Sequence, residues 1–185
     1  MKQIFHDYFE YESLLAKGIL LPFLEYHGIS LQGKRVLDVG YGERGILHSL
    51  AEHFELEGMG IDYGENMIAA CRPVKGVEFK KADFFEYDFQ EKFDFILLRD
   101  VLEHCVDIFA MPSRISSLLS DKGLHYITHT PYLSPFGGHQ HNGNSIFANL
   151  PYIQFLPEAV FLKLIDPSGN IYKTSTYLVK DLKRI

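Results

Sequence analysis

The stretch VLDVGYGERG, residues 36–45, decides the fold. It is a short apolar run that enters a glycine-rich turn, and the turn opens an amphipathic segment of helical spacing. Gly40, Gly42 and Gly45 form a GxGxxG pattern in the order strand, turn, helix. The first two glycines allow a tight turn and close approach of a ligand to the backbone, and the third lets the helix pack on the strand. Free N–H groups at the helix N-terminus would attract an anion.

Carboxylates follow the glycines at informative positions. Asp62 ends a second short strand, twenty residues after Gly42, where a carboxylate can accept hydrogen bonds from both hydroxyls of a ribose. Asp83, followed by Phe84, closes a third strand region, where a carboxylate and a ring suit an adenine. Asp38 lies inside the first strand, where burial of a carboxylate is costly unless it is paired. A cationic or amine-bearing ligand would supply that pairing.

Short apolar runs alternate with longer amphipathic ones, which predicts an α/β fold. Five strands with helical crossovers make a Rossmann-like, doubly wound, mainly parallel sheet with helices on both faces. The predicted strands are Arg35–Val39, Gly58–Ile61, Val77–Lys80, Phe93–Leu98 and Leu124–Thr128, the last one after a turn at Asp121–Gly123. The predicted helices are one or two within 8–28, then Glu43–Phe54, Glu65–Cys71, Ile108–Leu119 and Pro157–Ile165. Residues after Pro131 read as a long loop without regular structure, and Asn170–Ile185 as a strand and a helical turn.

Length and composition exclude several classes. A chain of 185 residues fits one domain, with an N-terminal helical segment (1–30), a cofactor-binding core (34–130) and an acceptor-side segment (131–185). A net charge of −6 argues against a basic nucleic-acid-binding face. Cys71 and Cys105 are too few for a disulfide framework. The longest apolar run is broken by Pro22 and no signal peptide is visible, so no membrane contact and a cytoplasmic location are expected.

With these motifs in order, the chain resembles the class I S-adenosylmethionine-dependent methyltransferases, in the small-molecule branch with VLDVGxG and VLEH-like motifs. The likeness rests on the glycine motif, Asp62, Asp83, Phe93-Asp94 and Val101-Leu102-Glu103-His104, and covers about residues 30–130. It implies S-adenosylmethionine as cofactor and S-adenosylhomocysteine as product. Gly40 and Gly42 would line the methionine, Asp62 would bind the ribose, Asp83 and Phe84 would flank the adenine, and Arg99 and Asp100 would face the methyl-transfer side. The full cofactor-binding set expected from the resemblance is Asp38, Gly40, Tyr41, Gly42, Gly45, Asp62, Tyr63, Asp83, Phe84, Arg99 and Asp100.

The chain departs from the family pattern in two places. Tyr41 and Glu43 stand where small residues are common, which narrows the turn without abolishing it. The family sheet ends in an antiparallel hairpin, and about twenty residues after the last predicted helix are too few for it, so the hairpin is expected to be absent or incomplete. An open sheet edge would then favour a homodimer or another partner.

Histidines are the candidate bases for methyl transfer to a hydroxyl. His104, His129 and His139 are the candidate catalytic residues, and the sequence does not choose among them. His139 and His141 have metal-ligand spacing, but no carboxylate or thiolate completes a tetrahedral site, so no metal is expected. Tyr8, Phe9 and Tyr11 belong to a helix packed on the sheet or, alternatively, to a lid over the cofactor.

The resulting prediction is transfer of the sulfonium methyl group to oxygen, nitrogen or carbon of a small molecule by in-line displacement. Two alternatives stay open. A nicotinamide-dependent oxidoreductase shares GxGxxG and the distal aspartate, although Asp38 and the VLEH segment disfavour it. A methyltransferase-fold domain that binds a cofactor or a partner without catalysis is the second.

Overall fold

The computed structural model describes residues 8–42, 45–64, 73–102, 105, 107–137, 140, 143 and 145–165. The chain divides into two compact units. One contains Lys2–Arg99 and Phe109–Ile127, and the other contains Asp100–Ile108 and Thr128–Ile185. The organisation as one domain with three segments stays a prediction. The predicted helix Glu65–Cys71 and the tail from Asn170, on which the expectation of an absent or incomplete hairpin rests, lie outside the described residues.

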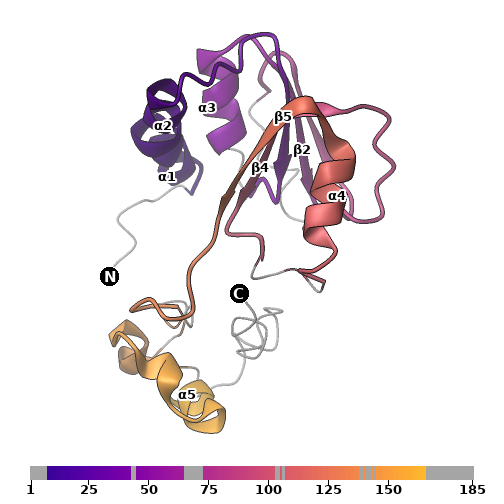
Figure 1. The fold of residues 1–185 in the computed structure, drawn as a ribbon. Helices are drawn as coiled ribbons and strands as arrows, with labels where there is room; N and C mark the ends of the chain where they lie inside the picture. The colour runs from indigo at the N-terminus through magenta and orange to yellow at the C-terminus, as the bar shows by residue number, and fades with distance from the viewer. Residues whose placement is uncertain are drawn as a thin grey trace. The chain divides into compact units, whose positions relative to one another are not determined.

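The larger unit is built on a five-stranded sheet (Figure 1). Its strands are β1 Arg35–Val39, β2 Glu57–Asp62, β3 Val77–Lys81, β4 Phe93–Arg99 and β5 Leu119–Thr128, in the order β3-β2-β1-β4-β5. β1 pairs in parallel with both β2 and β4, and β2 pairs in parallel with β3. The first four strands occupy their predicted positions to within one residue at each end. The α/β, mainly parallel architecture is therefore confirmed.

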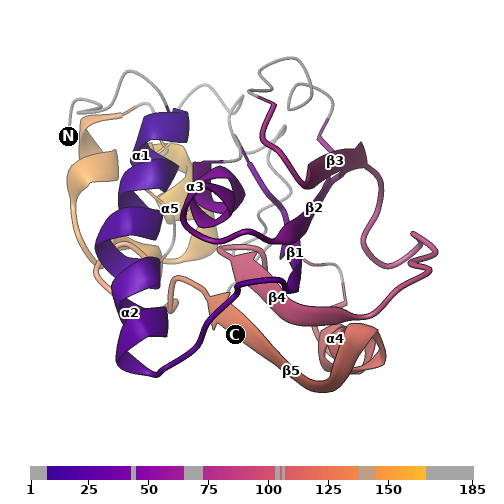
Figure 2. The same cartoon turned by 90° about the horizontal axis from the view of Figure 1, so that it is seen from above.

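Helices cover both faces of this sheet (Figures 1 and 2). The helices α1 Tyr8–Leu15, α2 Leu21–Tyr26 and α3 Gly45–His53 lie on one face, and α4 Met111–Leu118 lies on the other. A π-helical turn, Ala16–Leu20, joins α1 to α2 directly before Pro22, which lacks the N–H that an α-helix would use there. In the described part of the chain, no helix has the length and apolar character needed to cross a membrane.

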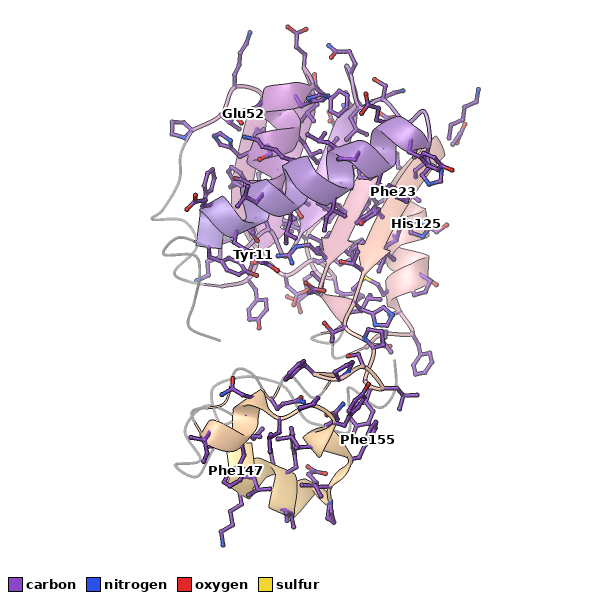
Figure 3. All side chains as sticks on the ribbon, turned by 90° about the vertical axis from the view of Figure 1, so that its left-hand side faces the viewer. Tyr11, Phe23, Glu52, His125, Phe147 and Phe155 are labelled. Carbon is purple, nitrogen blue, oxygen red and sulfur yellow. The ribbon has the colours of Figure 1, made fainter. Side chains whose placement is uncertain are left out.

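The main core lies between the sheet and the three helices α1, α2 and α3. Its fully buried members come from both layers: Ala16, Leu24, Val36, Leu47, Leu50 and Leu97. The Phe23 ring of α2, labelled in Figure 3, lies edge to face with the Tyr126 ring of β5, with centroids 5.3 Å apart. Burial of leucine-sized side chains stabilises a fold by about 1.5–3 kcal/mol each, so this buried core anchors the N-terminal helices to the sheet.

The α4–β5 connection differs from the prediction. Asp121–Gly123 was expected to form a turn, but β5 starts at Leu119 and runs through these residues. α4 ends at Leu118 because Leu119 is already extended, at φ −72° and ψ 142°. A Cβ on Gly123 would lie 2.9 Å from the Phe93 carbonyl oxygen, so the glycine permits close packing of the chain on β4. The polar residues Asp121 and Lys122 are exposed on the strand, so their composition resembles that of a turn.

The smaller unit contains more regular structure than predicted. Two 3₁₀ helices, Ile146–Asn149 and Ile153–Phe155, lie within the expected loop, and α5 Glu158–Ile165 follows as predicted from the proline before it. The buried amides of Gln140 and Gln154 bond to each other at 3.1 Å, and each also donates to backbone carbonyls. The two amides donate hydrogen bonds to backbone carbonyl oxygens. A proline- and glycine-rich segment cannot provide these carbonyls with partners by forming long helices or strands.

Asp94 connects three strands, and its removal should destabilise the sheet. Oδ2 accepts from the Arg35 N–H at 3.0 Å and Oδ1 accepts from the Ser120 hydroxyl at 3.0 Å, and these bonds lower the pKa of Asp94, the Arg35 bond most. A lowered folded-state pKa means that this stabilisation is present above the unfolded pKa of about 4 and is lost as the pH falls.

Asp94→Ala should lower the free energy of unfolding by about 1–3 kcal/mol at pH 7, with a smaller loss at low pH. Urea titration across pH checks this, with Asp121→Ala on the exposed part of β5 as control. Equal losses in both variants would contradict it.

Candidate functional site

The glycine-rich loop lies at the carboxyl end of β1. Gly40 and Gly42 have φ values of 69° and 52°, which only glycine adopts without strain. The Gly40 N–H donates to the Ile61 carbonyl at 2.8 Å and ties the loop to the end of β2. A Cβ on Gly42 would lie 2.7 Å from Glu12 Oε1, so a carboxylate lies directly on the loop. Both the backbone conformation and the space above it therefore require glycine.

Gly45 starts α3 and has a different neighbour from the one expected. A Cβ there would lie 2.3 Å from the Phe9 carbonyl oxygen and 2.8 Å from the Ser13 nitrogen. The nearest atoms belong to α1, whereas the motif predicted packing of the helix on the strand. The third glycine of the motif thus lets the N-terminal helix lie against the start of α3.

Asp38, buried in the middle of the sheet, has an unusual charge environment. Its relative exposure is 3%, and its neighbours across the register are Gly60 and Leu97. Burial is the largest cause that raises the pKa of Asp38 well above its ordinary value, and the charges of Glu12 and Asp62 raise it further. The Arg99 charge opposes them. Three carboxyl groups and one guanidinium therefore interact around the end of β1, an arrangement that favours a cationic group.

Asp62 ends β2 as predicted, and Tyr63 follows it directly. Asp62 Oδ1 accepts from the Gly64 N–H at 2.8 Å, which fixes the carboxyl group by a local turn. The Tyr63 ring is 69% exposed. A fixed carboxylate beside an exposed ring is suited to a ribose and the base attached to it.

Asp83 and Phe84 follow β3, where Asp83 is exposed and Phe84 is buried. Asp83 Oδ1 accepts from the Phe85 N–H at 2.7 Å. The Phe84 ring is 8% exposed, and the Arg114 guanidinium of α4 lies 5.6 Å from its centroid. Packing against α4 accounts for the burial of Phe84, and the adenine role of both residues stays a prediction.

Tyr41, Arg99 and Asp100 complete the expected set. The Tyr41 ring is buried against Phe79, with centroids 5.1 Å apart, so the side chain turns into the core. Arg99 ends β4 in the larger unit. Asp100 starts a segment of the smaller unit with φ 53°, and its N–H donates to the Thr128 carbonyl at 2.9 Å. A positive φ at a residue other than glycine marks a strained backbone position.

Glu12 is the residue that the sequence reasoning missed. Its side chain is 3% exposed, Oε2 accepts from the Gly45 N–H at 2.9 Å, and Oε1 lies 3.3 Å from Arg99 Nη2. The same Nη2 donates to the Tyr8 hydroxyl at 3.2 Å. Nothing in the local pattern of α1 marks Glu12 as buried, because its partners lie 33 and 87 positions away in the sequence.

The candidate bases are only partly described. His104 and His139 lie outside the described residues. His129 follows β5, and its Nδ1 is buried with no hydrogen-bond partner among the described residues. Over that same part of the chain, no three His, Cys, Asp or Glu side chains gather to hold a metal ion. The catalytic histidines stay a prediction.

Comparison with known proteins places the chain among the methyltransferases. A model described as "Methyltransferase domain" matches residues 30–173. Ubiquinone biosynthesis O-methyltransferase of Bradyrhizobium diazoefficiens is 29% identical over 103 residues, 53% of this chain and 40% of that protein. Phosphoethanolamine N-methyltransferase 3 of Arabidopsis thaliana is 36% identical over 102 residues, 52% of this chain and 21% of that one.

A solved structure gives the same result. Phosphoethanolamine N-methyltransferase 2 of Haemonchus contortus, in complex with phosphomonomethylethanolamine and S-adenosylhomocysteine, is 31% identical with a TM-score of 0.54. The match covers 59% of this chain and 27% of that one. The chain belongs to the methyltransferase domain family, and it spans less than half the length of the curated relatives it matches.

Burial of Asp38 should make the ligand-free protein less stable as the pH rises. A carboxyl whose folded-state pKa is raised binds its proton more tightly in the folded state, so stability falls from about pH 4 up to the raised pKa. Asp38→Asn removes the ionisation and should raise the free energy of unfolding at pH 7 while leaving it nearly unchanged at pH 4. Urea titrations at both pH values measure the difference, with Asp121→Asn as control. An Asp38→Asn variant less stable than the parent at pH 7 would contradict the assignment.

Replacement of Gly45 and of Gly18 by alanine should change the free energy of unfolding in opposite directions, because only Gly45 lies where α1 packs on α3. Gly45→Ala should lower the free energy of unfolding by about 1–3 kcal/mol because the new Cβ would meet the α1 backbone. Gly18→Ala has no atom within 4 Å of its Cβ position and should stabilise the helix by up to about 1 kcal/mol. Thermal or urea unfolding of the two variants compares them directly. A neutral Gly45→Ala would show that α1 does not rest on the start of α3.

Proposed function

We propose that this protein transfers the methyl group of S-adenosylmethionine to a small-molecule acceptor by in-line displacement. The observation that carries the proposal is the glycine loop after β1, with two left-handed glycines beside the buried Asp38 and the fixed carboxylate of Asp62. Membership of the methyltransferase domain family and the carboxyl-rich surroundings of the loop support it.

The residues fit this cofactor. Bound S-adenosylmethionine supplies an electrophilic sulfonium methyl group and an α-ammonium group, both cationic, and the end of β1 has three carboxyl groups against one guanidinium. Gly40 and Gly42 give the loop a left-handed backbone, and the Glu12 carboxylate lies against position 42, where it could pair with a cationic group of the cofactor. Asp62 would accept hydrogen bonds from the ribose hydroxyls, and Tyr63 would cover the adjoining base.

The contribution of the protein to the reaction is alignment. An in-line displacement needs no covalent intermediate with the enzyme, and holding the reacting atoms about 3–3.5 Å apart with water excluded supplies most of the acceleration. When the acceptor is a hydroxyl, His104, His129 and His139 remain the three candidates for a general base. Of these, only His129 lies among the described residues. Amine acceptors need only that their lone pair be free.

Relatives guide the class of acceptor. The names of the two curated relatives indicate an oxygen acceptor in one and a nitrogen acceptor in the other. We further propose that the acceptor is a small molecule and that the protein does not bind nucleic acid. We also propose that it is cytoplasmic and forms a homodimer. The two cysteines and the net charge of −6 support the location and the exclusion of nucleic acid.

The alternatives make different predictions for binding. A nicotinamide-dependent oxidoreductase would bind NADH, whereas the family match favours a sulfur nucleotide. A non-catalytic binding domain would bind S-adenosylmethionine without turnover. Calorimetry with S-adenosylmethionine, S-adenosylhomocysteine and NADH, followed by a methyl-transfer assay on phenol, catechol and amine acceptors, separates the three.

Removal of the Asp62 carboxylate should weaken cofactor binding. Charge-assisted hydrogen bonds to two ribose hydroxyls contribute roughly 1.5–3 kcal/mol, so Asp62→Ala should raise the dissociation constant of S-adenosylmethionine by about ten- to two-hundred-fold. Isothermal titration measures it, with Asp88→Ala, an exposed carboxylate bonded to Gln90, as control. Unchanged affinity in Asp62→Ala would remove Asp62 from the site.

A further inference from the structure

The segment 145–157 of the smaller unit has its polar side chains inside and its apolar side chains outside. Its sequence, SIFANLPYIQFLP, contains no charged residue. Gln154 is 1% exposed, whereas Ile146 is 81% exposed, which reverses the usual preference of the two residue types. The large apolar side chains exposed on this segment, here called the apolar surface, are Ile146, Phe147, Leu150, Tyr152, Phe155 and Leu156.

The buried polar side chains provide partners for the backbone carbonyls of this region. Gln154 Nε2 donates to the carbonyl oxygens of Tyr132 at 3.0 Å and of Ser134 at 2.7 Å. Gln140 Nε2 donates to the Leu150 carbonyl at 3.2 Å, and the Tyr132 hydroxyl donates to the Gln154 carbonyl at 2.7 Å. These hydrogen bonds are directed inward, so the exposed side of the segment consists largely of apolar side chains.

Backbone N–H groups of the two 3₁₀ helices are also paired within the segment. Those of Ala148, Leu150, Phe155 and Leu156 each donate to the carbonyl three residues earlier. At a surface in contact with water this pairing is optional, because water can bond to a free group. In an apolar medium each unpaired backbone group costs several kcal/mol, roughly, so internal pairing is required there. The segment therefore has the properties that an apolar medium demands.

A lipid surface fits this segment better than a protein partner does. Protein interfaces have a polar rim and about one hydrogen bond per 100–200 Å², to which this segment contributes no charged side chain. The Tyr152 and Phe155 rings stack, with centroids 6.1 Å apart and planes 12° apart. Tyrosine has an apolar ring and a polar tip, which suits the boundary between lipid headgroups and acyl chains.

We propose that residues 145–157 dock the protein on a phospholipid bilayer by inserting the apolar surface at the boundary between headgroups and acyl chains. The inference goes beyond the proposed function and does not depend on methyl transfer. The sequence predicted no membrane contact because its longest apolar run is broken by Pro22. Shallow insertion of an apolar face needs no spanning run.

A single tryptophan can report on this docking, because the chain contains none. Phe155→Trp places an indole in the apolar surface. Its emission should be that of a water-exposed indole in buffer, should shift to the blue on addition of phosphatidylcholine vesicles, and should be quenched by brominated acyl chains. Tyr26→Trp, at an exposed aromatic residue of α2 in the larger unit, is the matched control and should show neither change.

A pair of charge variants measures the contribution of the apolar surface to vesicle binding. Ile146→Glu should lower the partition coefficient on phosphatidylcholine vesicles by at least about tenfold, because it removes the insertion of one isoleucine side chain. Ile19→Glu makes the same change at an exposed isoleucine of the larger unit and should change the coefficient by less than about threefold. Co-sedimentation of the 185-residue chain with vesicles measures both.

The remaining outcomes overturn the inference. Failure of the parent protein to bind vesicles would do so, as would equal effects of the two glutamate variants or equal shifts of the two tryptophan variants. Blue-shifted emission of Phe155→Trp before vesicles are added would show that protein covers the apolar surface. Loss of self-association in Ile146→Glu, without vesicle binding by the parent, would assign the surface to contacts between copies of the chain. If Ile146→Glu does not fold, the tryptophan variants still decide. Calorimetry with S-adenosylmethionine tests the proposed function separately.

Discussion

Parallel pairing of β1 on both of its sides is the constraint on which the site depends. Because β2 and β4 run in the same direction as β1, all three carboxyl ends meet at one edge of the sheet. The glycine loop, Asp62 and Arg99 lie at these ends. The turn after β1 must then reverse within a few residues to enter α3, and the positive φ values of Gly40 and Gly42 make that reversal possible.

The elements that the sequence predicted are those with a local cause. β1, β2, β3 and β4 have apolar runs of strand length, and their bounds were correct to within a residue. β5 was predicted correctly from Leu124 to Thr128, but its first five residues were missed because Asp121–Gly123 has the composition of a turn. The carboxylates at β1 and β2 could be found because their spacing from the glycines is fixed by the βαβ unit.

The role of Glu12 has no such local cause. Its burial arises from contacts with Gly45 and Arg99, which depend on how α1 packs on the completed sheet. A glutamate in a helix is usually solvated, and a single sequence cannot show which helical glutamate is buried instead. One indirect signal existed: Arg99 directly follows the apolar run of β4, so an acidic partner was needed for a cation so near the core. The partner itself could be identified only in three dimensions.

Charge around the glycine loop also bears on the order of events in the proposed reaction. Asp38, Glu12 and Asp62 outnumber Arg99, so the site favours ligands with net positive charge. S-adenosylmethionine has one positive charge more than S-adenosylhomocysteine, because methyl transfer converts the sulfonium to a neutral thioether. For unit charges roughly 6 Å apart at an effective dielectric constant of about 20, each pairwise interaction contributes about 3 kcal/mol before desolvation is counted. For a cofactor bound at this loop, the carboxyl excess would therefore favour the substrate form over the product form. A buried carboxyl that weakens the ligand-free fold thus has a functional reason to be retained.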